Sequence, residues 1–217
     1  KIGARQIFVV EQAFAAALGT GLPVYEPQGS FIVDIGGGTT EVALVSMGGV
    51  VLSHSVRVAG NKIDEAIAGF LKKQHAILVT DRVAEQIKFD LADVRSERKM
   101  EHIAVVRGRD IATGMPLTVD VNMAKVSEAI REPIQEILGA IKWVLGRIPP
   151  ELCADILQNG IFLTGGSAAL PNLDTMIATE FGVPVSVARD AGECTTLGAG
   201  YMADHFDMLG GISGKAE

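Results

Sequence analysis

Hydrophobic positions alternate between short apolar runs, which predict strands, and spacings of three to four residues, which predict helices. We expect strands at 7–10, 31–34, 40–47, 50–58, 103–106, 117–121, 161–163 and 185–188. We expect helices at 11–18, 61–71, 80–91, 122–148, 151–158, 172–181 and from residue 194 onward. The strand at 40–47 is apolar on both faces, so the sheet should be covered on both sides. The run at 7–10 is predicted to be a short buried strand.

The order of these elements indicates an α/β fold. A strand and helix lead into a three-strand meander, a helical insertion with a small sheet follows, and strands and helices then alternate again. Residues 1–60 and 122–217 should form the core α/β subdomain, and residues 61–121 a small inserted α+β subdomain. Pro133 falls within the long helical pattern and should kink or split it.

Composition narrows the class of protein. The chain has 217 residues, 48% of them hydrophobic, which is ordinary for a globular protein with a good core. Its formal charge of −7 argues against a broad nucleic-acid surface, which needs clustered Lys and Arg. Cys153 and Cys194 match neither a metal spacing nor a disulfide framework, which favours a reducing cytoplasm. Because the chain begins at Lys1 and its first strand follows closely, we expect it to be part of a longer protein.

A glycine-rich turn follows Asp34, at the end of the strand at 31–34, with the sequence Ile-Gly-Gly-Gly-Thr-Thr. The carboxylate can hold a hydrated Mg²⁺, which keeps several waters and uses one or two carboxylates. Glycine N–H groups and threonine hydroxyls can bind phosphate. A hairpin turn beside an Asp is the alternative, but three consecutive glycines exceed what a hairpin needs.

A second glycine-rich turn, at 164–168, follows the strand at 161–163. Its glycines would let a base or a ribose pack on the backbone, although a plain strand-to-helix turn explains them equally well. Gly60 and Asp64 lie where a strand leads into a helix, and Asp64 could reach a ribose or a metal-bound water. Spacing alone favours a first-turn acid stabilised by the helix dipole.

Two polar pairs complete the candidate residues. Glu85 and Lys88 are three residues apart, on the helix face opposite Val83, Ile87 and Leu91. They could bracket a ribose or a base, but spacing alone favours a solvent-exposed salt bridge. Glu11 and Gln12 open the first helix, where either could orient an attacking water or act simply as a polar first-turn residue.

Five motifs in this order resemble the MreB family of bacterial actin homologues. They are DIGGGTTEVA at 34–43, VAGNKIDEAI at 58–67, AEQIK at 84–88, PPEL at 149–152 and GIFLTGG at 160–166. The match covers nearly the whole chain and corresponds to the C-terminal two-thirds of such a protein. The wider superfamily also includes actin, heat-shock chaperone ATPases and sugar kinases.

The resemblance implies an actin-like ATPase domain with a ribonuclease-H-like fold, in which this chain is the second lobe. It implies ATP or ADP with Mg²⁺ in a cleft between two lobes. The catalytic residues implied are Gln12, Glu11 and Asp34, with Asp34 also holding Mg²⁺ through water. The nucleotide-binding residues implied are Gly36, Gly37, Gly38, Thr39, Thr40, Gly60, Asp64, Glu85, Gln86, Ile87, Lys88, Gly165, Gly166, Ser167 and Ala168.

The chain departs from the family pattern in three ways. Gln12 stands where the family usually has Glu, which bears on the rate of hydrolysis; actin also uses a glutamine. Ser167 replaces the usual third glycine of the adenosine loop and should tilt the base. The first phosphate loop and much of the first lobe lie outside this chain, so we expect weak or no ATP binding, and no hydrolysis, by this chain alone.

The function implied is that of an ATP-binding, filament-forming cytoskeletal protein that maintains cell shape. Slow Mg²⁺-dependent ATP hydrolysis would be coupled to polymerisation. The implied partners are further copies of the protein, with membrane and cell-wall synthesis proteins contacted through regions outside this chain, and no nucleic acid. The implied location is the cytoplasm, at the inner face of the membrane. The alternatives are a dedicated paralogue such as a magnetosome-aligning filament, a non-catalytic nucleotide-binding adaptor, and a sugar-kinase-like phosphotransferase.

Overall fold

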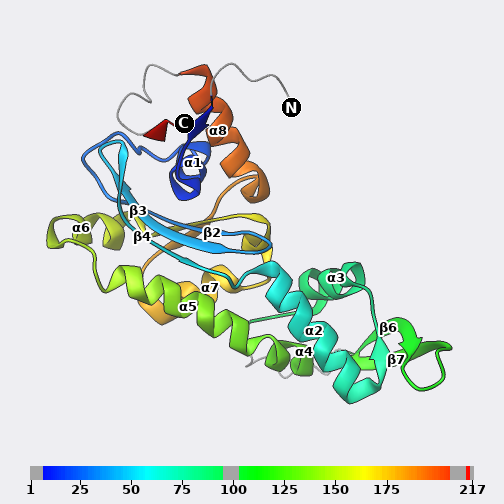
Figure 1. Ribbon diagram of the computed structural model, residues 1–217. Helices are drawn as coiled ribbons and strands as arrows, with labels where there is room; N and C mark the ends of the chain where they lie inside the picture. The colour runs from blue at the N-terminus through cyan, green and yellow to red at the C-terminus, as the bar shows by residue number, and fades with distance from the viewer. Residues whose placement is uncertain (1–6, 95–102, 206–213, 216–217) are drawn as a thin grey trace.

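The computed structural model describes residues 7–94, 103–205 and 214–215, and its centre is a five-stranded mixed sheet (Figure 1). The strand order is β4-β3-β2-β8-β9. β2, β3 and β4 form the predicted antiparallel meander, whereas β8 and β9 extend the sheet in parallel from β2. The bounds are β2 Ser30–Ile35, β3 Thr40–Ser46, β4 Gly49–Val56, β8 Ile161–Thr164 and β9 Val185–Val187. The predicted α/β class is confirmed.

Helices cover both faces of this sheet, as the apolar pattern predicted (Figure 1). On one face, the alanine-rich α1 (Gln12–Gly19) and α8 (Cys194–Asp204) pack together. There Ile32, Ala43 and Val45 form a core with the buried alanines of α1. The alternate residues of β2 and β3 face the main core, together with α5 (Arg131–Leu145) and α7 (Leu173–Phe181). α6 (Pro150–Asn159) precedes β8.

α2 (Gly60–His75) carries the chain from the large sheet to a small antiparallel sheet of order β5-β6-β7. The strands are β5 Ile77–Leu78, β6 Ile103–Asp110 and β7 Pro116–Asn122, with α3 (Asp81–Leu91) between β5 and β6. A single core cluster runs from the large sheet through α2 to this region. The division at 61–121 therefore stays a prediction.

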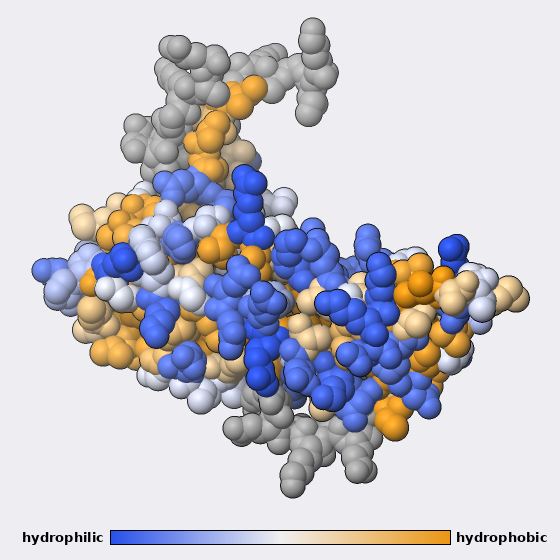
Figure 2. Space-filling view, turned by 60° about the horizontal axis from the view of Figure 1, so that its bottom comes forward, coloured by the Kyte–Doolittle hydropathy of each residue, from blue (hydrophilic) through white to orange (hydrophobic). Residues whose placement is uncertain are grey.

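Figure 2 shows the molecule turned from the view of Figure 1 so that the bottom of that view comes forward. Hydrophilic side chains cover much of the middle of this face. Apolar side chains also reach the surface, and β6 exposes Ile103 and Val105. Within the described ranges, no helix combines the length and the apolar composition needed to cross a bilayer.

Two elements show where the hydrophobic pattern succeeds and fails. The helix predicted at 122–148 is split into α4 (Met123–Ala129) and α5, and Pro133 lies in the first turn of α5. A first-turn residue needs no intrahelical N–H bond, so the proline is tolerated there. The predicted buried strand at 7–10 is wrong. Among the described residues, β1 (Phe8–Val9) pairs with β10 (Gly214–Lys215) and not with the large sheet, and Ile7 and Val9 are 66% and 60% exposed.

The contact between α1 and α8 depends on two glycines. A Cβ built on Gly19 would lie 1.8 Å from the carbonyl oxygen of Cys194, and one built on Gly198 would lie 1.8 Å from that of Ala15. Both obstacles are backbone atoms, which cannot rotate away as the end of a side chain can. The two helices therefore approach so closely that neither position has room for a side chain.

Gly198→Ala should destabilise the fold by about 1–3 kcal/mol, the usual range for overpacking, because the added methyl group forces α1 and α8 apart. Gly200 is the control on the same helix, since a Cβ there meets nothing within 4 Å. Gly200→Ala should leave stability unchanged or raise it by up to about 1 kcal/mol. Urea unfolding followed by circular dichroism measures both, and equal effects would contradict the close approach.

Candidate functional site

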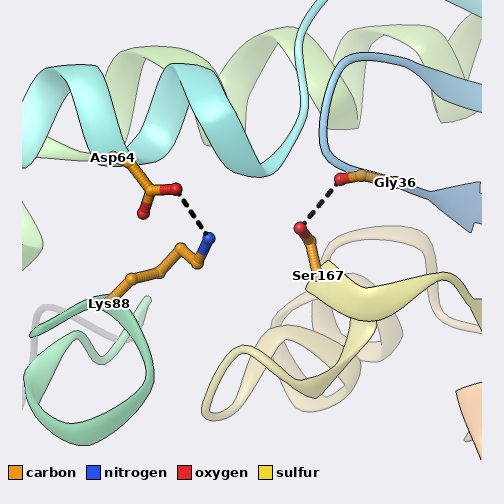
Figure 3. Close-up of polar contacts among 4 residues, drawn as sticks. All are labelled: Gly36, Asp64, Lys88 and Ser167. Carbon is orange, nitrogen blue, oxygen red and sulfur yellow. Dashed lines mark hydrogen bonds and ion pairs between the residues drawn. The ribbon is translucent and has the colours of Figure 1, made fainter. Parts of the chain in front are cut away.

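Four segments that are distant in sequence meet at one edge of the large sheet. The Ser167 hydroxyl, after β8, donates a hydrogen bond of 2.9 Å to the carbonyl oxygen of Gly36, after β2. The Gly60 N–H, at the start of α2, donates to the same oxygen at 3.1 Å. Lys88 of α3 contacts Asp64 of α2 beside this junction (Figure 3). The structure thus brings together both glycine turns and the two helices that the sequence singled out.

Parallel pairing of β2 with β8 places the two turns side by side. Asp34 is in register with Thr164, so the residues after each strand emerge at the same edge of the sheet. Gly165 has φ +85°, and a Cβ there would lie 2.3 Å from the carbonyl oxygen of Ile35. Only glycine therefore allows the second turn to pass this close to the first.

The first turn is an exposed loop whose backbone is partly free. The N–H groups of Gly36 and Asn61 bond to carbonyl oxygens within this region. Gly37 and Gly38 are exposed, and within the described residues no hydrogen bond occupies their N–H groups. A Cβ built on Gly38 meets nothing within 4 Å. The loop can therefore accept an anion at its tip, where N–H groups are natural donors.

Thr40, a residue of the predicted phosphate-binding set, has its hydroxyl engaged within the protein, and its contact with phosphate stays a prediction. Its side chain is fully buried, and its hydroxyl donates a 2.7 Å hydrogen bond to the carbonyl oxygen of Val58. The hydroxyl thus ties the segment that follows β4 to the first residue of β3. Phosphate contact by the neighbouring Thr39 stays a prediction.

Lys88 and Asp64 form an ion pair of 3.0 Å, with side chains 3% and 15% exposed. The other carboxylate oxygen of Asp64, Oδ1, is buried without a hydrogen-bond partner among the described residues. Burial raises the pKa of Asp64, and the bond to Lys88 opposes this rise. An unpartnered buried acceptor is unfavourable, so Oδ1 is suited to receive a donor from a ligand.

The buried face of α3 differs from the prediction. Lys88 was expected opposite Ile87, but both are buried together with Ala84. Its charge is compensated by Asp64, and its methylene stem can therefore pack like an apolar residue. A reading based only on apolar residues misses such a position. Glu85 and Gln86 are exposed, and the charge of Glu85 contributes to the raised pKa of Asp64.

Asp34 is 2% exposed, and one of its oxygens, Oδ2, accepts two hydrogen bonds. Gln12 Nε2 of α1 donates at 2.8 Å, and Thr195 Oγ1 of α8 donates at 3.2 Å. Glu11 is exposed and precedes α1 without capping it through its side chain. Sequence reasoning found Gln12 and Asp34 but missed Thr195, because a threonine early in a helix carries no distinctive signal.

Sequence reasoning also missed Glu41, which faces Asp34 across the β2–β3 ladder. The pKa of Glu41 is raised mainly by burial and further by the negative charge of Asp34. The hydrogen bond from the N–H of Ala13 opposes this rise. Glu41 lines a cavity of about 220 Å³, also formed by Glu11, Gln12, Ala13, Ser53, His54 and Ser55. The available signal was a carboxylate within an otherwise apolar strand.

Comparisons with known proteins show which family the chain resembles. A family model described as MreB/Mbl protein matches residues 1–211. The chain is 43% identical over 209 residues to the cell shape-determining protein Mbl of Bacillus subtilis, covering 96% of this chain and 62% of that protein. It is 44% identical over 209 residues to the cell shape-determining protein MreB of Escherichia coli K12, covering 96% and 60%. The chain thus spans about three fifths of the length of these relatives.

Solved structures give the same result for the fold. MreB5 of Spiroplasma citri bound to ADP superposes with a TM-score of 0.88 at 31% identity, covering 96% of this chain and 64% of that chain. The same protein bound to AMPPNP gives a TM-score of 0.83 at 32% identity, covering 91% and 59%. A MamK double helical filament gives 0.69 at 23% identity, covering 89% and 58%, which shows the fold alone. The predicted actin-like fold is confirmed.

Glu41→Gln should stabilise the protein at neutral pH. The variant keeps an acceptor for the Ala13 N–H and removes a charge that burial and Asp34 both disfavour. Because the folded-state pKa lies above the ordinary value of 4.5, ionisation of Glu41 removes stability as the pH rises through that raised pKa. We expect a higher Tm than wild type at pH 7 and no difference below about pH 4, where Glu41 is protonated in both states.

Thermal unfolding between pH 4 and 7 tests this expectation. Glu136→Gln, on the exposed surface of α5, is the matched control and should change the Tm little at any pH. A stabilisation by Glu41→Gln that grows as the pH falls would contradict the assigned direction of the pKa shift.

Proposed function

Because the chain belongs to the MreB/Mbl family, we propose that it is the second lobe of a filament-forming, ATP-binding protein that determines cell shape. The observation that carries this proposal is the convergence of Gly36, Ser167 and the Asp64–Lys88 pair at one edge of the sheet. Residues from four separate segments form this junction, and it lies at the carboxyl ends of parallel strands, where open α/β sheets bind ligands.

We place the nucleotide by its chemistry. Its phosphates lie over the free N–H groups of Gly37 and Gly38. Its ribose hydroxyls face Asp64, whose unpartnered Oδ1 can accept a hydrogen bond, with Lys88 alongside. The base lies over the turn at 165–168, where Ser167 is already held by Gly36. Glu85 and Gln86 are exposed beside Lys88 and complete the adenosine side.

Asp34 fits a hydrated Mg²⁺ beside these phosphates. Its carboxylate is held by two neutral donors and, within the described residues, by no Lys or Arg. Mg²⁺ needs only one or two carboxylates when phosphates supply further oxygens. The ion would neutralise phosphate charge, and Asp34 would orient its water shell. The described residues contain no cluster of three or more His, Cys, Asp or Glu that could hold a metal.

Slow hydrolysis follows from the residues around Asp34. Gln12 is the proposed water-orienting residue, and its amide is a weaker base than a carboxylate, so it positions water without accepting its proton. Glu11 is a nearby exposed acid. Since the protein's output is assembly, ATP binding and hydrolysis would bias the subunit between two conformations with different contacts.

Self-association is the proposed partner interaction, and repeated head-to-tail contacts would form an open filament. Support comes from the MreB/Mbl relatives that determine cell shape and from the MamK filament of the same fold. We place the complete protein in the cytoplasm at the inner face of the membrane. Contacts with membrane and cell-wall synthesis proteins would involve the part of the relatives that this chain does not span.

Gly38→Val should weaken ATP binding by the full-length protein at least about 10-fold, equivalent to about 1.4 kcal/mol. The added side chain enters open space at the loop tip, so the fold should survive while the phosphate position is filled. Gly49→Val is the matched control, because a Cβ on this first residue of β4 also meets open space. Titration with fluorescent ATP, with the Tm measured in parallel, tests this expectation. Equal affinities of Gly38→Val and wild type for ATP would refute the proposed position of the phosphates.

Filament assembly should depend on nucleotide. We expect the full-length protein to sediment with ATP, and open filaments to appear by negative-stain microscopy, but not with ADP or without nucleotide. Assembly that is independent of nucleotide would contradict the coupling. A monomer under all three conditions would instead favour the adaptor or sugar-kinase alternatives, which a phosphoryl-transfer screen separates.

A further inference from the structure

Asp34 joins three elements through a single oxygen atom. Oδ2 lies at the end of β2 and accepts from Gln12 of α1 and Thr195 of α8, at 2.8 and 3.2 Å. We call these three residues the Asp34 clasp. Gln12 lies 22 positions before Asp34 in sequence, and Thr195 lies 161 positions after it. The clasp therefore couples the side chain beside the glycine loop to both helices on that face of the sheet.

The chemistry of the clasp determines which end of the Gln12 amide faces Asp34. A carboxylate at this site only accepts hydrogen bonds, so the amide must present its NH₂ group. The amide oxygen, Oε1, then points away from Asp34, and within the part of the chain that the structure describes no hydrogen bond occupies it. That orientation is the one a water-orienting glutamine requires, since the amide oxygen must accept a hydrogen bond from the attacking water.

Thr195 restrains Asp34, the hydrogen-bond partner that sets the orientation of the Gln12 amide. A carboxylate with one donor can rotate about its χ2 bond, because that torsion has a broad energy minimum. A second donor at the same oxygen, from a different helix, restricts that rotation. The hydroxyl therefore holds Oδ2 where the Gln12 amide meets it.

The backbone around Thr195 is itself immobilised against α1. The carbonyl oxygen of Cys194, the preceding residue, lies where a Cβ on Gly19 would fall, and Gly198 approaches Ala15 equally closely. Since the first turn of α8 cannot shift without separating these backbones, the position of the Thr195 hydroxyl relative to Gln12 is set by the helix crossing.

We propose that Thr195 is a positioning residue for ATP hydrolysis, acting through Asp34 to hold the Gln12 amide oxygen toward the attacking water. This role rests on the proposed function. A purely structural role, in which Thr195 only satisfies a buried carboxylate, predicts lost stability but no selective loss of the hydrolysis step. The two roles are separated by a rate measured at saturating ATP.

The test uses the full-length protein with Thr195→Val, which keeps the side-chain shape and removes the hydroxyl. We expect single-turnover ATP hydrolysis to slow roughly 10- to 100-fold, the order of magnitude for a misplaced reacting group, while the Kd for ATP changes less than about 2-fold. Thr195→Ser retains the hydroxyl and should restore the rate. Thr196→Val is the matched control on the exposed side of the same turn and should behave as wild type.

A double-mutant cycle with Gln12→Ala shows whether Thr195 acts through Gln12. If it does, Thr195→Val should slow hydrolysis little in the Gln12→Ala background. An equal slowing in both backgrounds, an unchanged rate in Thr195→Val, or a matching loss of ATP affinity would overturn the proposal.

The same four proteins, unfolded thermally without nucleotide, test the clasp apart from any activity. We expect the double variant to lose less Tm than the sum of the single variants, because both donors share one oxygen. Additive losses would overturn the clasp. If wild type neither binds nor hydrolyses ATP, both the proposed function and the proposed role of Thr195 are wrong. Non-additive losses of Tm would in that case still show that the clasp exists.

Discussion

The parallel pairing of β2 with β8 is the constraint on which the rest of the site depends. Four paired positions, from Phe31 with Ile161 to Asp34 with Thr164, bring together two turns that are 130 residues apart in sequence. Once the strands are in this register, Ser167 can reach Gly36, and α2 begins directly beside them.

Much of this arrangement was predictable because it depends on local chemistry. Alternating and continuous apolar runs identified the sheet and its two covered faces, and the glycine turns identified the edge where we propose that a ligand binds. Pro133 marked the division between α4 and α5. These features need only the residues themselves and their nearest neighbours in sequence, together with the general behaviour of strands, turns and helices.

The features that escaped prediction depend on partners far away in the chain. Lys88 reads as a surface residue until Asp64, on another helix, compensates its charge. Thr195 is recognised as a candidate only through its hydrogen bond to the Asp34 carboxylate, 161 positions earlier in sequence. The apolar residues of β1 predicted a buried strand, but an apolar run alone does not indicate whether a layer of helices covers it. Tertiary pairing of this kind leaves no periodic signal in a single sequence.

The position of α2 gives the molecule a mechanical property. The helix has 16 residues and a length of about 24 Å, with its first turn hydrogen-bonded to the glycine loop and its far end packed against the small sheet. A small rotation at one end of a stiff helix produces a larger displacement at its other end. Tilting it by about 5° at the loop would displace the other end by about 2 Å, given that length. A rotation of α2 at the glycine loop would thus appear at the small sheet as a change of position.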